Sequence, residues 1–214
     1  MGRRSTSGNR TRHSRHLLRK SPRLRARPSS AHKRRGTGLA DGTQFDAPEV
    51  WHEPRDDGEL QIIVEEPRDG YMHPVTRDEV IQRIAQLPPQ FQTGVEYVHL
   101  SRMTRKRRLF PCYGLQWGTA VYLYPIECDL EELYMCAPTP QQRIETEMYG
   151  GRWIQDGSHW WQVWTERTIR DYYLNNVLIH EIGHINDDRN TRFVDRERYA
   201  DWFAIEYGYR ATNR

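Results

Sequence analysis

The sequence predicts an α+β domain in which a small antiparallel sheet packs on two consecutive helices near the C-terminus. Two observations support this prediction. Short segments rich in β-branched and aromatic residues, typical of strands, recur through the middle of the chain. Two segments, about residues 169–185 and 195–208, instead show the 3.6-residue periodicity of helices. We therefore expect one domain over residues 46–214, with the order strand, helix, strands, hairpin, helix, helix.

The N-terminal segment, residues 1–45, differs sharply in composition from this domain. Residues 1–40 contain 13 Lys and Arg and no Asp or Glu, whereas the remainder carries 19 basic and 29 acidic residues. Few apolar and many Ser, Pro and Gly residues predict a disordered basic tail. Three interpretations stay open for residues 1–40: a solvated extension, a weak contact with nucleic acid or another polyanion, and a transit-like leader. We expect no secretory signal and no membrane span, which would need about 20 apolar residues.

The first half of the domain supplies strands and one helix. Thr76 and Glu79 form the capping-box pattern T-x-x-E, which predicts a helix that ends near Leu87, before two prolines. The basic segment 102–108 is expected to be a loop or hairpin tip, and 152–164 a Trp-rich hairpin turning at Asp-Gly. Three further segments have the pattern of strands: 60–65, 95–100 and 120–124.

The five residues His180-Glu-Ile-Gly-His184 form the pattern H-E-x-x-H within a predicted helix. Histidines four residues apart lie on one helix face, where one zinc ion can bind both. Glu181 leaves the same turn about 100° away, where it can reach a water on the metal. Because apolar residues surround the motif on nearly all sides, we expect a buried helix, in which the polar groups need partners.

A third ligand is expected from the following helix. Asp195 is a plausible N-cap and Gly208 a plausible C-terminal stop. On a helical wheel Ala200, Ala204 and Gly208 fall near Glu197, so the face that carries Glu197 is lined with small residues. Small residues allow two helices to approach closely, as a metal held between helices requires. A surface helix with scattered charges is the alternative.

Asp201 lies one turn after Glu197 and can accept the outer N–H of a liganding histidine. Together, His180-Glu-Ile-Gly-His184 and Glu197-Arg-Tyr-Ala-Asp201 resemble the H-E-x-x-H…E-x-x-A-D signature of gluzincin metallopeptidases, especially small soluble members and Ste24/HtpX-like catalytic domains. The resemblance covers about residues 166–208. It implies a zincin-like fold, zinc bound by His180, His184 and Glu197, Glu181 as general base and acid, and Asp201 as support for a histidine ligand.

The resemblance implies a zinc-dependent metallopeptidase with one zinc ion, acting on a peptide or protein substrate. His159, Tyr207 and Tyr209 are the candidates for an oxyanion donor. The hairpin at 152–164 is the candidate wall of the substrate cleft, with core packing of its tryptophans as the alternative. Two other functions stay open: a non-catalytic zinc-stabilised binding protein whose basic arm contacts a polyanion or nucleic acid, and a latent enzyme whose cleft is covered.

The three cysteines, Cys112, Cys128 and Cys136, are unevenly spaced and include no C-x-x-C pair. This spacing fits neither a disulfide framework nor a four-cysteine zinc site. We expect buried free thiols in a reducing compartment, which favours a cytoplasmic location.

Overall fold

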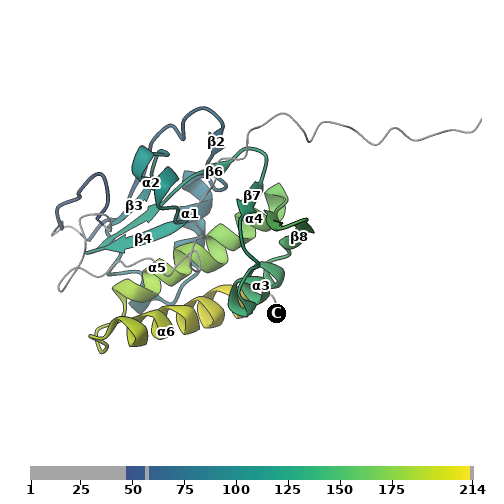
Figure 1. The fold of residues 1–214 in the computed structure, drawn as a ribbon. Helices are drawn as coiled ribbons and strands as arrows, with labels where there is room; N and C mark the ends of the chain where they lie inside the picture. The colour runs from purple at the N-terminus through teal and green to yellow at the C-terminus, as the bar shows by residue number, and fades with distance from the viewer. Residues whose placement is uncertain (1–46, 56–57, 213–214) are drawn as a thin grey trace, which may run out of the picture.

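The computed structural model describes residues 47–55 and 58–212 (Figure 1). The predicted basic tail at 1–45 lies outside the described residues. The described chain is mixed α and β, in agreement with the predicted α+β class. Its strands are β1 (Gln61–Val64), β2 (Tyr71–Met72), β3 (Tyr97–Leu100), β4 (Gly114–Trp117), β5 (Ala120–Leu123), β6 (Ile126–Glu127), β7 (Glu131–Tyr134), β8 (Arg152–Asp156) and β9 (His159–Val163).

The helices alternate with these strands in the first two thirds and dominate the C-terminal third. They are α1 (Arg77–Ala85), the 3₁₀ turn η1 (Pro89–Phe91), α2 (Arg105–Leu109), α3 (Pro140–Met148), α4 (Glu166–Tyr172), the π-helical turn η2 (Tyr173–Val177), α5 (Leu178–Ile185), α6 (Phe193–Phe203), the π-helical turn η3 (Ala204–Tyr209) and α7 (Arg210–Thr212). No helix in the described ranges is both long enough and apolar enough to cross a membrane.

The main sheet corrects the prediction of an antiparallel sheet. Its strand order is β1-β3-β5-β4, and β3 pairs in parallel with both β1 and β5, while only β4 pairs antiparallel with β5. Helix α1 lies in the connection from β1 to β3 and returns the chain to the same end of the sheet, as parallel pairing requires. A separate sheet, β7-β9-β8, is antiparallel throughout, and β2 pairs with β6.

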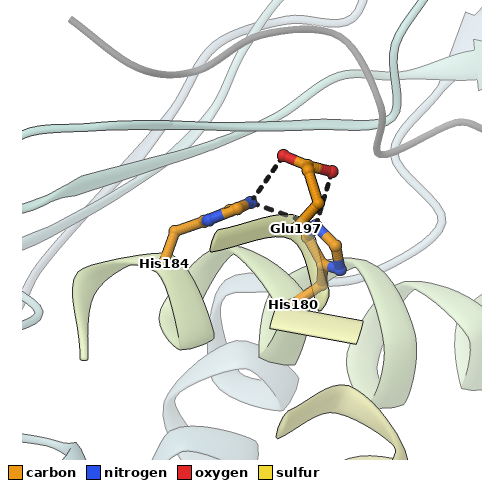
Figure 2. A group of neighbouring side chains, drawn as sticks. All are labelled: His180, His184 and Glu197. Carbon is orange, nitrogen blue, oxygen red and sulfur yellow. Dashed lines mark hydrogen bonds and ion pairs between the residues drawn. The ribbon is translucent and has the colours of Figure 1, made fainter. Parts of the chain in front are cut away.

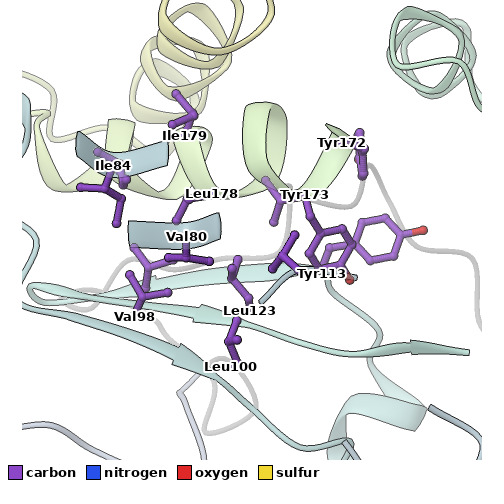
Figure 3. Close-up of a cluster of buried hydrophobic side chains, with 14 of the residues drawn as sticks. Val80, Ile84, Val98, Leu100, Tyr113, Leu123, Tyr172, Tyr173, Leu178 and Ile179 are labelled. Carbon is purple, nitrogen blue, oxygen red and sulfur yellow. The ribbon is translucent and has the colours of Figure 1, made fainter. Parts of the chain in front are cut away.

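The core lies between one face of the main sheet and the helices α1 and α5 (Figure 3). Side chains alternate along β3, so Val98 and Leu100 face this core while His99 belongs to the opposite face. From the helices, Val80 and Leu178 are both fully buried in the same cluster. This packing fixes α5 beneath the sheet, and α6 lies along the other side of α5 (Figure 1).

The α1 capping box is confirmed. The Thr76 hydroxyl accepts from the Glu79 amide at 3.3 Å, and the Glu79 carboxylate accepts from the Thr76 amide at 2.8 Å. We expect Thr76→Ala to lower the free energy of unfolding by about 0.5–2 kcal/mol, because the Glu79 amide at the start of the helix loses its acceptor. The urea midpoint should fall with an unchanged slope. Thr76→Ser keeps the hydroxyl and should match the parent, so equal midpoints for the Ala and Ser variants would contradict this role.

The predicted loop at 102–108 is correct only for residues 102–104, because the chain forms the short helix α2 from Arg105 onward. Thr104 caps it by accepting from the Arg107 amide at 3.1 Å. Arg107 is buried, and its Nε donates to Glu49 Oε1 at 3.1 Å. Burial alone would lower the pKa of Arg107, but Cys112, Tyr124 and Glu49 raise it overall. One member of this basic run, Arg107, is therefore held by an acidic residue far away in the chain, whereas Arg105 and Arg108 are exposed as the sequence suggests.

The prediction that the helix bearing H-E-x-x-H is buried is confirmed. Every residue from Leu178 to His184 is buried. The boundaries of the next helix differ from the prediction. Helix α6 begins at Phe193 rather than after an Asp195 cap, and Gly208 does not end it, since the chain continues through η3 into α7.

Gly208 is needed for close approach rather than for a stop. A Cβ at this position would lie 1.8 Å from the Asn175 carbonyl oxygen, so the backbones of η2 and η3 touch there. The small-residue face predicted for this helix therefore does allow close packing, but it extends past α6 into the π-helical turn η3.

Candidate metal centre

Three predicted ligands meet between α5 and α6. His180 and His184 come from successive turns of α5, and Glu197 faces them from α6 (Figure 2). His184 Nε2 lies 3.1 Å from His180 Nε2 and 3.4 Å from Glu197 Oε1. All three residues are buried, and their ligand atoms lie within 4.8 Å of one another. The structure therefore brings together the three residues that the sequence predicted.

This donor set fits a metal ion better than it fits an ordinary hydrogen-bonded cluster. Two neutral imidazoles whose Nε2 atoms face each other can form only one hydrogen bond between them. The second carboxylate oxygen, Glu197 Oε2, is buried, has no hydrogen-bond partner among the residues that the structure describes, and lies 3.9 Å from His180 Nε2. Two nitrogens and a carboxylate directed at one point are the ligands of open tetrahedral metal sites. The cluster can thus hold a metal ion.

Asp201 of α6 lies beside His180 of α5. Its Oδ1 is 3.3 Å from His180 Nδ1, the ring nitrogen directed away from the cluster. A carboxylate at Nδ1 keeps the proton there and leaves the Nε2 lone pair for a metal. The outer nitrogen of His184 is buried and has no hydrogen-bond partner in the described part of the chain.

Close approach of α5 and α6 makes the cluster compact. A Cβ added to Gly183 would lie 3.0 Å from Phe203 Cβ and 3.1 Å from Ala200 Cα, so a larger residue there would push α6 away from α5 by a few tenths of an ångström. Near the loop that connects the two helices, Arg196 of α6 donates to the His184 carbonyl oxygen at 3.2 Å. The prediction that small residues on the face of Glu197 admit a neighbouring helix is confirmed.

Glu181 lies beneath the edge strand β4. It is 3% exposed. A Cβ at Gly114, the first residue of β4, would lie 2.7 Å from Glu181 Oε1 and 2.7 Å from Val177 Cγ1. Burial raises the pKa of the nearby Cys112 thiol, Arg107 opposes this change, and the Glu181 carboxylate raises the pKa further. Cys112 and Gly114 thus belong to the surroundings of Glu181.

Sequence reasoning missed this strand and chose the wrong neighbour for the cluster. The Trp-rich hairpin of β8 and β9 forms as predicted, but it joins β7 through β9, and it is β4 that packs against α5. Trp164, which follows the hairpin, is buried and stacks on Tyr172 with ring centroids 4.8 Å apart. The signal for β4 was available in the alternation of Gly114–Trp117 and the turn at Gly118, which resemble a second hairpin.

The oxyanion candidates receive no support from their surroundings. The Tyr207 ring packs against Phe203 and Phe91, with centroids 4.6 and 4.8 Å away. Tyr209 packs edge to face on Tyr149 at 5.5 Å. His159 pairs with Asp156 across the hairpin, in the sheet that does not contain β4. We therefore assign none of them to the cluster.

The cysteine prediction is correct in part. All three thiols are free, but only Cys112 is buried, and Cys128 and Cys136 are exposed. Cys128 lies in the turn after β6, and Cys136 lies just after β7. Both side chains face solvent.

Comparisons with known proteins leave the cluster as the main guide to function. No protein-family model, curated protein or solved structure matches the chain. Fold and cluster together define a mixed α/β protein with a buried His-His-Glu group that can hold a metal, next to a buried glutamate.

Proposed function

We propose that this protein is a zinc-dependent metallopeptidase. The observation that carries the proposal is the buried cluster of His180, His184 and Glu197 with Glu181 on the turn between the histidines. Three protein ligands leave a fourth position open, as in catalytic rather than structural zinc sites. The resemblance of these residues to the gluzincin signature supports the same activity and a zincin-like fold.

In this proposal each residue has one task. His180, His184 and Glu197 would hold zinc, which when bound lowers the pKa of a water toward about 7 and polarises a carbonyl group. Asp201 fixes the ring of His180 through Nδ1. Glu181 accepts the proton of the attacking water and delivers it to the departing amide nitrogen.

Strand β4 offers a place for the substrate beside Glu181. It pairs with β5 on one side, and no strand pairs with its other side in the part of the chain that the structure describes. An extended peptide can add to such an edge through main-chain hydrogen bonds, which give affinity without a strict demand on side chains. A peptide bound along β4 would pass above the turn that carries Glu181, which favours a peptide or protein substrate.

Any side chain at position 114 should then impair peptide hydrolysis. We expect Gly114→Ala to keep its metal but to hydrolyse peptide about 10²-fold more slowly, because the added Cβ displaces Glu181 from its position. Gly151→Ala is the matched control, since its Cβ would also be crowded, at 2.6 Å from Trp164 and Thr146, but away from Glu181. Kinetics and metal content of both variants check this, and an equal loss of activity in both would contradict the role of Gly114.

The activity can be tested directly on the full chain. Metal analysis by mass spectrometry should find about one zinc ion per chain, and a library of quenched fluorescent peptides should be cleaved in a reaction that a chelator stops and added zinc restores. Zinc without cleavage of any peptide or unfolded protein would favour the alternative, a zinc-stabilised binding protein. A folded protein that takes up no zinc would refute the proposal. The free thiols favour a reducing compartment, and we propose a cytoplasmic location on that basis.

A further inference from the structure

Two π-helical turns face each other at the base of the metal-binding helix pair. Turn η2 leads directly into α5, and η3 follows directly after α6. They meet where Gly208 packs on the Asn175 carbonyl, a contact that leaves no room for a Cβ. Because a π-helical turn inserts an extra residue, it changes the direction in which the following side chains point. The contact between the turns therefore influences how α5 presents its histidines to α6.

A buried arginine from a third helix connects the two turns. Arg83 of α1 is 5% exposed, and its Nε donates to Asn175 Oδ1 in η2 at 2.5 Å. Its Nη2 donates to the Tyr207 carbonyl oxygen in η3. The guanidinium group, with its rigid set of donors, thus joins one acceptor from each turn.

Asn175, the partner of Arg83 in η2, makes two further hydrogen bonds. Asn175 Nδ2 donates to Asp171 Oδ1 at 2.6 Å, and the Asn175 carbonyl accepts from the Tyr149 hydroxyl at 3.1 Å. Arg83 makes no ion pair with a carboxylate in the described ranges, and its directional bonds go to neutral oxygens. Burying a cation is costly, so a residue that served only to fill space here would be apolar.

We infer that Arg83 is a positioning residue for the metal centre. By joining η2 to η3 it sets the spacing and register of α5 against α6, and so the distance of Glu197 from the two histidines. The inference rests on the proposed metal site and assigns to Arg83 no contact with metal or substrate.

Metal affinity of full-length variants tests this role. Zinc alone is titrated into chelator-treated protein in competition with a chromophoric chelator, and the visible spectrum of bound cobalt reports the geometry of the ligands. We expect Arg83→Met to bind zinc on the order of tenfold more weakly than the parent, with an altered cobalt spectrum, as when groups behind metal ligands are removed. Arg83→Lys keeps the charge but has a single donor nitrogen in place of the guanidinium fork, and should recover part of the loss. Arg77→Met, at an exposed position on the same helix, should match the parent.

The outcomes separate this inference from the proposed function. Folded Arg83 variants with parental zinc affinity and cobalt spectra would overturn the inference alone. Unfolding of both the Met and the Lys variant would show that Arg83 supports the whole fold rather than the metal centre, and would overturn it as well. A folded parent that binds no zinc would refute the proposed function and this inference with it.

Discussion

Replacing Glu181 with Gln is expected to leave about one zinc ion per chain and to reduce peptide hydrolysis by about 10²–10⁴-fold. The amide has nearly the shape of the carboxylate, so the buried position beneath Gly114 stays filled and the three ligands keep their geometry. The amide nitrogen cannot accept a proton from water at neutral pH. The loss should therefore appear in kcat, with KM little changed.

Metal content and steady-state kinetics on the same preparations check this prediction. Asp188→Asn is the matched control, because it makes the same chemical change on a side chain that is 88% exposed and only loosely paired with Arg189. Parental turnover in Glu181→Gln would show that Glu181 is not the base. Loss of zinc in that variant would show instead that Glu181 supports the ligands.

Replacing His184 with Ala is expected to remove both the bound zinc and the activity. Its Nε2 is central to the cluster, at 3.1 Å from His180 Nε2 and 3.4 Å from Glu197 Oε1. Without it, two ligands from different helices remain, and a catalytic site needs three. The deleted imidazole also leaves a cavity next to Gly183, so we expect a folded protein with a lower unfolding midpoint.

Zinc analysis and circular dichroism check the second prediction. His73→Ala serves as the control, since His73 is also partly buried but bonds the Glu65 carbonyl, on the loop after β1, and should keep its zinc. A folded His184→Ala protein with a full zinc ion would mean that the metal binds elsewhere. Equal loss of zinc in both variants would point to a general effect on folding.

Local patterns determined much of the candidate site. Histidines four residues apart meet on one helix face whatever surrounds them, because the helix repeat fixes their direction. The same repeat placed Glu197 and Asp201 on one face of α6, and the structure finds Asp201 at His180 Nδ1. The Thr76 cap was predictable for the same reason, since both partners lie within one turn.

Tertiary structure decided what lies around those residues. The parallel pairing of β1, β3 and β5 depends on the path of α1, and strand alternation looks the same in parallel and antiparallel sheets until partners are known. The choice of β4 as the strand above Glu181 depends on a contact over 60 residues apart in the chain. The extension of the last helix through Gly208 depends on the Asn175 backbone, which no local signal reveals.

The sequence by itself thus picked out the residues of the cluster and its neighbours, His180, Glu181, His184, Glu197 and Asp201, since the spacing within each of the two helices places them on one face or turn. Only the tertiary structure decided which strand covers Glu181, how closely α5 and α6 approach, and which buried cation joins their π-helical turns. The physical reason is that periodicity acts over a few residues, whereas close backbone contacts and buried polar bonds such as that of Arg83 with Asn175 exist only once distant segments have packed.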